Sequence, residues 1–353
     1  MATCPAQLGP GNAISTRKAG GTITGTTLNV SVVICAYAEE RWHDLVAAVE
    51  SIRRQTIPPR EIVVVIDHNA RLLERARAHL AGCVVIENCE PRGLSGARNS
   101  GIALAQGELV AFLDDDATAE PDWLERLSHC CEDSQVLGAG GRVEPLWSGR
   151  RPAWFPKEFY WVVGCTYQDL PDKPIVVRNP YGGCTCIRRE VFEVTGSFRT
   201  EMGRIGTRPM GCEETELCIR AKQRWPQRVF LFDPQAKIYH RVSSHRAGWR
   251  YFRSRCYAEG LSKAAVAQYV GAQDGLASER TYTLRTLPRG VLRGLADGCF
   301  RLDPAGFLRA GAIIAGLVTT TAGYIVGTAS LRLGQRRKAS AGRDFKQSMR
   351  PTE

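Results

Sequence analysis

Three consecutive aspartates, Asp114, Asp115 and Asp116, directly follow the apolar run 109–113. A run of this length is typical of a buried strand, so the carboxylates are expected where that strand leaves the core. Neighbouring carboxylates repel one another, and a divalent cation such as Mg²⁺ or Mn²⁺ relieves the repulsion because it prefers oxygen ligands. In an extended segment Asp114 and Asp116 point to one side and Asp115 to the other. The spacing therefore predicts a metal that Asp114 and Asp116 hold against a diphosphate, in preference to a solvated acidic turn.

A glycine-rich segment precedes this strand. Gly93, Gly96 and Gly101 permit tight turns and close backbone approach. Residues 97–105 are rich in helix formers, and Gly107 is a suitable stop. The expected order is thus a glycine turn, a short helix, a buried strand and the carboxylates.

The first half of the chain alternates between buried-strand and helical patterns. Such alternation predicts an α/β fold with a mainly parallel sheet. The predicted strands are 30–37, 61–67, 83–86 and 109–113, and the predicted helices between them are 41–54, 72–80 and 97–105.

Polar side chains stand at the carboxyl ends of several predicted strands. Ligands of parallel α/β sheets bind beyond these ends, where Tyr37, Asp67 and the aspartates from Asp114 onward fall. A nucleotide is therefore expected there. No GxGxxG follows the first strand, which argues against an NAD-dependent dehydrogenase.

The segment GLSGARNSGIALAQGELVAFLDDDATAEPDWLE closely resembles the inverting family-2 glycosyltransferases of the GT-A fold. The resemblance extends over residues 30–245. It implies a Rossmann-like GT-A domain with a mainly parallel sheet, a Mg²⁺ or Mn²⁺ cofactor, and a nucleotide-diphosphate sugar as donor, with a UDP-sugar expected. It implies that Tyr37, Asp67, Gly96, Arg98, Asp114 and Asp115 contact the nucleotide sugar, and that Asp114 and Asp116 bind the metal.

Two further site residues rest on the same resemblance. The family carries Glu-Asp-x-Asp/Glu-Leu with the Asp as general base, and here Glu214 occupies that position, one methylene longer. Without the resemblance, Glu213, Glu214 and Glu216 would be interpreted as N-terminal residues of a helix, favoured by its dipole. His240 ends the strand-like piece 236–240, and the resemblance implies that it contacts the metal or the diphosphate, although a lone histidine is also compatible with a structural role.

Charge and cysteine content limit the location and the partners. The net charge is +11, and basic residues dominate from 246 to 350. No nucleic-acid module is recognisable, so the excess charge predicts contact with an anionic membrane surface or a phosphorylated substrate. The 13 cysteines are scattered among apolar segments and no secretory signal is visible, which favours reduced thiols in the cytoplasm. The predicted location is therefore cytoplasmic, with peripheral binding to the cytoplasmic face of the membrane as an alternative.

The last third predicts a helical extension. Residues 249–270 form an aromatic and basic helix that either packs plainly or meets an anionic lipid or phosphorylated acceptor. Residues 310–331 lack any charge and are long enough to span a bilayer, but the run Thr319-Thr320-Thr321 and four glycines favour a membrane-surface or packed helix. The predicted organisation is a disordered tail at 1–28, a GT-A domain at 29–245, a helical basic and apolar region at 246–338, and a disordered tail at 339–353.

The predicted function is metal-dependent, inverting transfer of a sugar to an acceptor hydroxyl. The acceptor is a glycan, a lipid-linked molecule or a small molecule, with a cell-envelope glycan favoured weakly by the C-terminal third. A nucleotidyltransferase that makes activated sugars is an alternative, but residues 36–41 lack the glycine-rich basic loop for a triphosphate. A non-catalytic binding protein of the same fold is a second alternative, against which the joint presence of Asp114, Asp116 and Glu214 argues.

Overall fold

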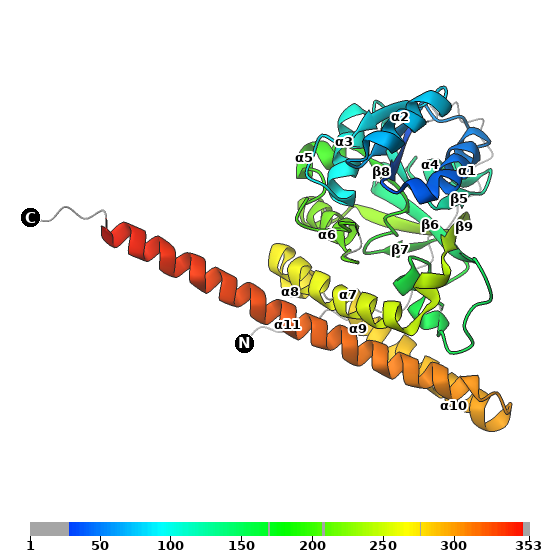
Figure 1. Cartoon of the computed structure of the whole chain (residues 1–353), viewed down its shortest axis with the longest axis vertical. Helices are drawn as coiled ribbons and strands as arrows, with labels where there is room; N and C mark the ends of the chain where they lie inside the picture. Colours follow the sequence, from blue (N-terminus) through cyan, green and yellow to red (C-terminus); the bar gives the residue numbers. More distant parts are fainter. Residues whose placement is uncertain (1–27, 169, 207–208, 276, 349–353) are drawn as a thin grey trace, which may run out of the picture.

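The computed structural model describes residues 28–348, apart from 169, 207–208 and 276. Most of the predicted N-terminal tail and the last five residues therefore lie outside the described part. Figure 1 shows an α/β body with a layer of long helices along one side. The helix α11 extends well past this body towards the C-terminus.

A nine-stranded sheet forms the centre of the described chain, in the order β3-β2-β1-β4-β8-β6-β9-β5, with β7 paired to β9. The strands are β1 (Val30–Ala36), β2 (Glu61–Ile66), β3 (Val84–Glu87), β4 (Leu109–Asp114), β5 (Ala117–Ala119), β6 (Val136–Trp147), β7 (Ile175–Val177), β8 (Cys184–Arg188) and β9 (Val229–Val242).

The predicted parallel order is confirmed for the first half of the sheet. Strand β1 pairs in parallel with both β2 and β4, and β2 pairs in parallel with β3. The second half is mixed, because β8 runs antiparallel to β4 and to β6, whereas β6 and β9 are parallel. The architecture is that of the GT-A α/β fold with a helical C-terminal region.

Helices cover both faces of the sheet, because successive residues of the central strands point to opposite sides. Val32 and Ile34 of β1 belong to one hydrophobic cluster and Val33 to another. The helices α1 (Trp42–Arg53) and α4 (Trp123–Cys130) cover the first face; α3 (Leu94–Leu104), α5 (Arg189–Thr195) and α6 (Glu213–Arg224) cover the second. The remaining helices of this part are η1 (Glu39–Arg41), α2 (Ala70–His79), η2 (Lys157–Val163) and η3 (Ser244–Ala247).

The C-terminal region is helical, as predicted. It comprises α7 (Trp249–Val270), α8 (Ala272–Gly275), α9 (Ala277–Thr281), the π-helical turn η4 (Tyr282–Thr286), α10 (Leu287–Phe300) and α11 (Ala305–Ser348). Helix α11 continues to Ser348, beyond residue 339, where the predicted C-terminal tail begins. Residues 339–348 include alanine and basic residues and no proline, which is compatible with a helix.

Small residues let α11 lie directly on α7. A Cβ on Gly260 would come 2.1 Å from the carbonyl oxygen of Thr320, and one on Gly323 would come 2.2 Å from that of Tyr257. Glycine is therefore required at this crossing. One side of α11 therefore packs on the rest of the molecule (Figure 1).

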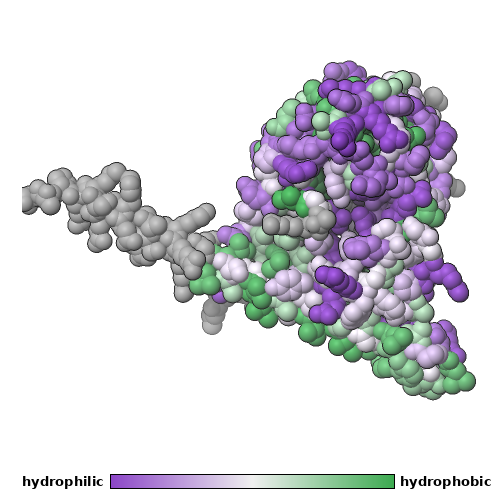
Figure 2. Space-filling model, in the orientation of Figure 1, coloured by the Kyte–Doolittle hydropathy of each residue, from purple (hydrophilic) through white to green (hydrophobic). Residues whose placement is uncertain are grey.

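The opposite side of α11 carries exposed apolar side chains. Phe307, Ile314, Val318 and Ile325 recur at spacings of whole helical turns and are 47%, 53%, 62% and 61% exposed. We call these four residues the apolar stripe. Figure 2 shows hydrophobic residues gathered along the edge of the molecule that the C-terminal helices form. By length and composition, the portion Ala305–Leu333 could span a membrane, with a mean hydropathy of 1.5.

Candidate active site

Asp114, Asp116 and His240 come together at one end of the sheet. Asp114 ends β4, and the short strand β5 that follows pairs with β9 so that Ala117 faces His240. One ligand atom from each of the three side chains lies within 4.8 Å of the others. We call these three residues the metal cluster. His240 approaches most closely, with its Nε2 3.1 Å from Oδ1 of Asp116.

Three basic side chains in and beside the metal cluster keep Asp116 ionised. Burial alone would favour the neutral acid of Asp116, but His240, Arg246 and Arg41 together hold its pKa well below the usual range. Asp116 is therefore anionic, although it is almost fully buried. Burial would lower the pKa of His240, but Asp116 raises it well above its usual value, so His240 must give up its proton to bind a metal. With His240 neutral, two carboxylate oxygens and one imidazole nitrogen make a donor set that fits Mn²⁺, and Mg²⁺ would use the two carboxylates.

Gly183 leaves room for the carboxylate of Asp114. A Cβ at position 183 would lie 2.2 Å from Oδ2 of Asp114, so a larger residue cannot share this space. On another side, a guanidinium nitrogen of Arg98 lies 3.6 Å from Oδ1 of Asp114. Asp114 is therefore confined between a glycine backbone and a buried cation.

Asp115 shares the guanidinium of Arg41 with Asp116. Its Oδ1 accepts a hydrogen bond of 2.7 Å from Nη1 of Arg41, which also reaches Asp116 at 3.0 Å. Burial raises the pKa of Asp115 to about 7 against the lowering effect of Arg41, with Asp116 adding to the rise. Arg41 was not identified from the sequence, although a basic residue soon after the first strand was a visible signal.

Tyr37 and Asp67 are predicted to contact the nucleotide. Both line the large cavity described below. Arg41 stacks over the Tyr37 ring at 4.7 Å, while the carboxylate of Asp67 accepts hydrogen bonds from Asn88 and from the backbone of Gly93. Asp67 thus ties the glycine-rich turn to the end of β2.

Gly96 differs from the other predicted nucleotide-sugar residues. It does not belong to the described residues that line the cavity. A Cβ there would come 2.0 Å from the carbonyl oxygen of Pro91, so glycine is needed for α3 to pack on the preceding loop. The structure thus shows a packing reason for glycine at this position, and the contact of Gly96 with the nucleotide sugar stays a prediction.

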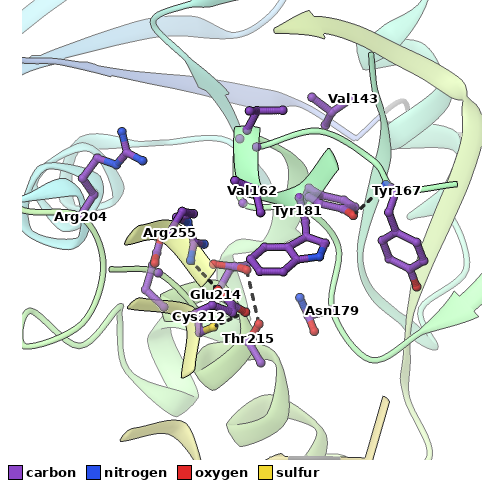
Figure 3. Close-up of a pocket in the computed structure, with 18 of the residues that line it drawn as sticks. Val143, Val162, Tyr167, Asn179, Tyr181, Arg204, Cys212, Glu214, Thr215 and Arg255 are labelled. Atoms are coloured by element: carbon purple, nitrogen blue, oxygen red, sulfur yellow. Dashed lines mark hydrogen bonds and ion pairs between the residues drawn. The ribbon is translucent and has the colours of Figure 1, made fainter. Parts of the chain in front are cut away.

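Glu213 and Glu214 open α6 and have different environments. Glu213 is 4% exposed and accepts a hydrogen bond of 2.9 Å from Arg98. Glu214 is half-buried and faces the cavity, where the Thr215 hydroxyl donates to it at 3.3 Å (Figure 3). Burial first, and the charge of Glu213 second, raise the pKa of Glu214 to about 7. A carboxylate with this pKa can take a proton near neutral pH.

A single cavity of about 780 Å³ connects these groups within the described part of the chain. It contains the metal cluster, Tyr37 and Asp67 on the sheet side, and Glu214 farther in. Its remaining wall comes from residues 204, 206 and 210–212 and from the C-terminal helices. Residues of this wall include Arg204, Tyr251, Arg255, Lys263, Tyr282, Leu287, Leu317, Thr321 and Tyr324.

Residues 31–196 match the family described as glycosyl transferase family 2. Over 243 residues, the chain is 37% identical to the glucosyl-dolichyl phosphate glucuronosyltransferase of Haloferax volcanii, an alignment that covers 68% of this chain and 77% of that protein. The chain belongs to glycosyl transferase family 2. It is a glycosyltransferase, as the sequence predicted.

Other similarities agree with this family-2 assignment. The succinoglycan biosynthesis protein ExoM of Rhizobium meliloti is 24% identical over 281 residues, which cover 77% of this chain and 82% of that protein. A mannosyltransferase from Pyrobaculum calidifontis, solved with GDP-Man and Mn²⁺, superposes with a TM-score of 0.52 over 87% of each chain at 19% identity. At that identity the second likeness is one of fold.

Proposed function

We propose that this family-2 glycosyltransferase moves a sugar from a nucleotide-diphosphate sugar to a hydroxyl of a lipid-linked acceptor, with inversion at the anomeric carbon. One observation carries the proposal. Glu214, whose pKa is raised to about 7, faces the same cavity as Asp114, Asp116 and His240. The candidate base and the metal cluster therefore face one cavity, in which the donor and the acceptor would bind together.

The proposed roles of the protein groups follow from their positions. Tyr37 and Asp67 would meet the nucleotide, and Arg98 would keep Asp114 in place. Mg²⁺ or Mn²⁺ held by the metal cluster would supply Lewis-acid stabilisation of the charge on the leaving diphosphate. Glu214 would receive the proton of the acceptor hydroxyl.

The bonds change in a single displacement. The acceptor oxygen bonds to the anomeric carbon as its proton passes to Glu214, and the bond from that carbon to the diphosphate oxygen breaks. The nucleoside diphosphate leaves with the electron pair of the broken bond. Because attack comes from the side opposite the leaving group, the anomeric configuration inverts.

The choice of substrates is supported by the relatives and by the surface. A glucosyl-dolichyl phosphate glucuronosyltransferase at 37% identity supports a lipid-linked acceptor, and we take a UDP-sugar as the donor. The apolar stripe of α11 is exposed while the other side of this helix packs on α7, so we place α11 along the membrane surface and not across it. Exposed Arg285, Arg289 and Arg301 nearby in the chain would suit the anionic cytoplasmic face.

A thermal-shift screen against nucleotides, with and without Mn²⁺, tests the donor class. Binding to the folded state raises the unfolding temperature by mass action. We expect stabilisation by UDP only when Mn²⁺ is present, and loss of this effect in Asp116→Ala. A shift with a nucleoside triphosphate alone would instead support sugar-nucleotide synthesis.

A further inference from the structure

Three basic side chains surround the phenol of Tyr251 inside the cavity. Nη2 of Arg204 lies 3.2 Å from the hydroxyl oxygen of Tyr251. Burial would raise the pKa of Tyr251, but the charges of Arg204, Arg246 and Arg255 overcome this and lower it. The phenol therefore marks a place of strongly positive potential on the cavity wall.

Two of these arginines already have carboxylate partners. Arg246 lies 3.4 Å from Asp116, and Arg255 lies 2.7 Å from Glu259. Among the residues whose side chains the structure describes, no carboxylate lies within ion-pair distance of Arg204. A half-buried guanidinium without a counter-charge favours an anionic ligand, and guanidinium and phenol together suit phosphate oxygens.

The place of Arg255 indicates which substrate would bring this anion. A Cβ on Gly211 would lie 3.0 Å from Nη2 of Arg255, and the thiol of Cys212 donates to Glu259, the partner of Arg255. Gly211 and Cys212 lie three and two positions before Glu214, and Figure 3 shows Arg255 beside Cys212 and Glu214. Arg255 thus lies beside the candidate base, whereas the donor diphosphate is expected at the metal cluster.

The cavity also has an apolar side next to this group. Leu287 of α10 and Leu317 of α11 line it, and so does Thr321, which is exposed. On α11, Val318 and Ile325 of the apolar stripe lie one turn to either side of Thr321. The cavity therefore reaches the surface beside the stripe, where an alkyl chain attached to a phosphate could leave it.

We propose that Arg204, Tyr251 and Arg255 bind the phosphate of a lipid-phosphate acceptor, separately from the donor diphosphate. This inference rests on the proposed function and adds the acceptor's anionic group and the residues that recognise it. Helix α7, which carries Tyr251 and Arg255, also carries Arg250 and Arg253. Arg250 and Arg253 are exposed and do not line the cavity. They serve as matched controls for a loss of positive charge.

Calorimetric titration with decyl phosphate, below its micelle concentration, tests this site without relying on turnover. The full-length protein is first saturated with Mn²⁺ and the nucleoside diphosphate that stabilises it. We expect decyl phosphate to bind under these conditions and decanol to bind at least tenfold more weakly. Arg204→Ala should weaken decyl phosphate at least tenfold, Tyr251→Phe by less, and Arg253→Ala not at all.

The titration can overturn the proposal in three ways. The proposal fails if decyl phosphate does not bind the protein that is saturated with the nucleoside diphosphate, if decanol and decyl phosphate bind equally, or if Arg204→Ala binds decyl phosphate as the native protein does. Binding of the nucleoside diphosphate by Arg204→Ala, measured by thermal shift, should equal that of the native protein. Loss of this donor binding would assign Arg204 to the donor and contradict the acceptor site. Failure of the donor to bind the native protein would count against the proposed function instead.

Discussion

The guanidinium of Arg98 donates to the carboxylate of Glu213 at 2.9 Å, and both side chains are buried. This ion pair engages the first of two adjacent glutamates and leaves Glu214 to face the cavity. Arg98 also approaches Asp114 at 3.6 Å. One buried cation thus links the start of α6 to the metal cluster.

Removing Glu213 should damage the fold more than removing Glu214. Glu213→Ala leaves Arg98 buried with a single, more distant carboxylate, and breaking a buried pair in this way typically costs about 3–5 kcal/mol. Urea unfolding should show a loss of this order. Glu214→Ala removes a carboxylate that burial already disfavours, so its free energy of unfolding should be unchanged or higher. Equal destabilisation by the two substitutions would contradict the different environments described for them.

Gly183 should be essential for metal binding. In Gly183→Ala the added methyl occupies the space of the Asp114 carboxylate, 2.2 Å from its Oδ2. We expect the apparent affinity for Mn²⁺, measured by the metal dependence of the UDP-induced thermal shift, to fall at least tenfold. Gly149→Ala is the control, because its Cβ would meet nothing within 4 Å. A native Mn²⁺ response in Gly183→Ala would show that the position of Asp114 does not govern metal binding.

The pH dependence of activity should follow the ionisation of Glu214. The base must be deprotonated, and its pKa is raised to about 7, so kcat/KM should rise tenfold per pH unit below 7 and level off above it. Initial rates between pH 5.5 and 8.5 would measure this. A profile that is already flat at pH 5.5 would contradict the proposed base.

The free energy of unfolding should fall as pH rises, whereas kcat/KM rises. A carboxylate whose folded-state pKa is raised from 4.5 to about 7 binds its proton more tightly in the folded protein, so stability falls as pH rises from 4.5 to 7. Asp115, also raised to about 7, contributes in the same window. The difference between native protein and Glu214→Gln isolates Glu214: the variant should gain relative stability as pH increases from 5 to 8.

The apolar stripe should control membrane binding. Ile314→Asp, Val318→Asp and Ile325→Asp together place three charges on the exposed side of α11, and we expect at least a tenfold loss of binding to vesicles containing anionic lipid. A triple aspartate variant at Val84, Leu104 and Val194, which are 43%, 45% and 50% exposed on the catalytic body, is the control. If both variants floated equally well with vesicles, the apolar stripe would not be the membrane-binding surface.

Local patterns were sufficient to predict the first half of the fold. Apolar runs predicted β1, β2 and β4, because a strand buried on both faces is continuously hydrophobic. The short edge strand β3 is also apolar, although it is partly exposed. The register that brings His240 to Asp116 depends on the pairing of β5 with β9, which joins residues more than a hundred positions apart. His240 was therefore reached only through the family resemblance.

Other parts of the site had no local signal. The approach of Gly183 to Asp114, and of Arg204 to Tyr251, arises from long-range packing between separate segments. The mixed half of the sheet is similar, since the small-residue strand β8 has no pattern that fixes its direction beside β4. The position of Glu214 after Glu213 was visible in the sequence, but their different partners were not.

The central claim is that Glu214 is the base of a glycosyl transfer, and Glu214→Gln tests it most directly. The substitution keeps the size of the side chain and removes its ability to accept a proton. Transfer from a UDP-sugar to a lipid-phosphate-linked glucoside should fall at least a thousandfold, while the Mn²⁺-dependent thermal shift with UDP stays at the native value. Turnover within tenfold of the native protein, with donor binding intact, would show that another group takes the proton.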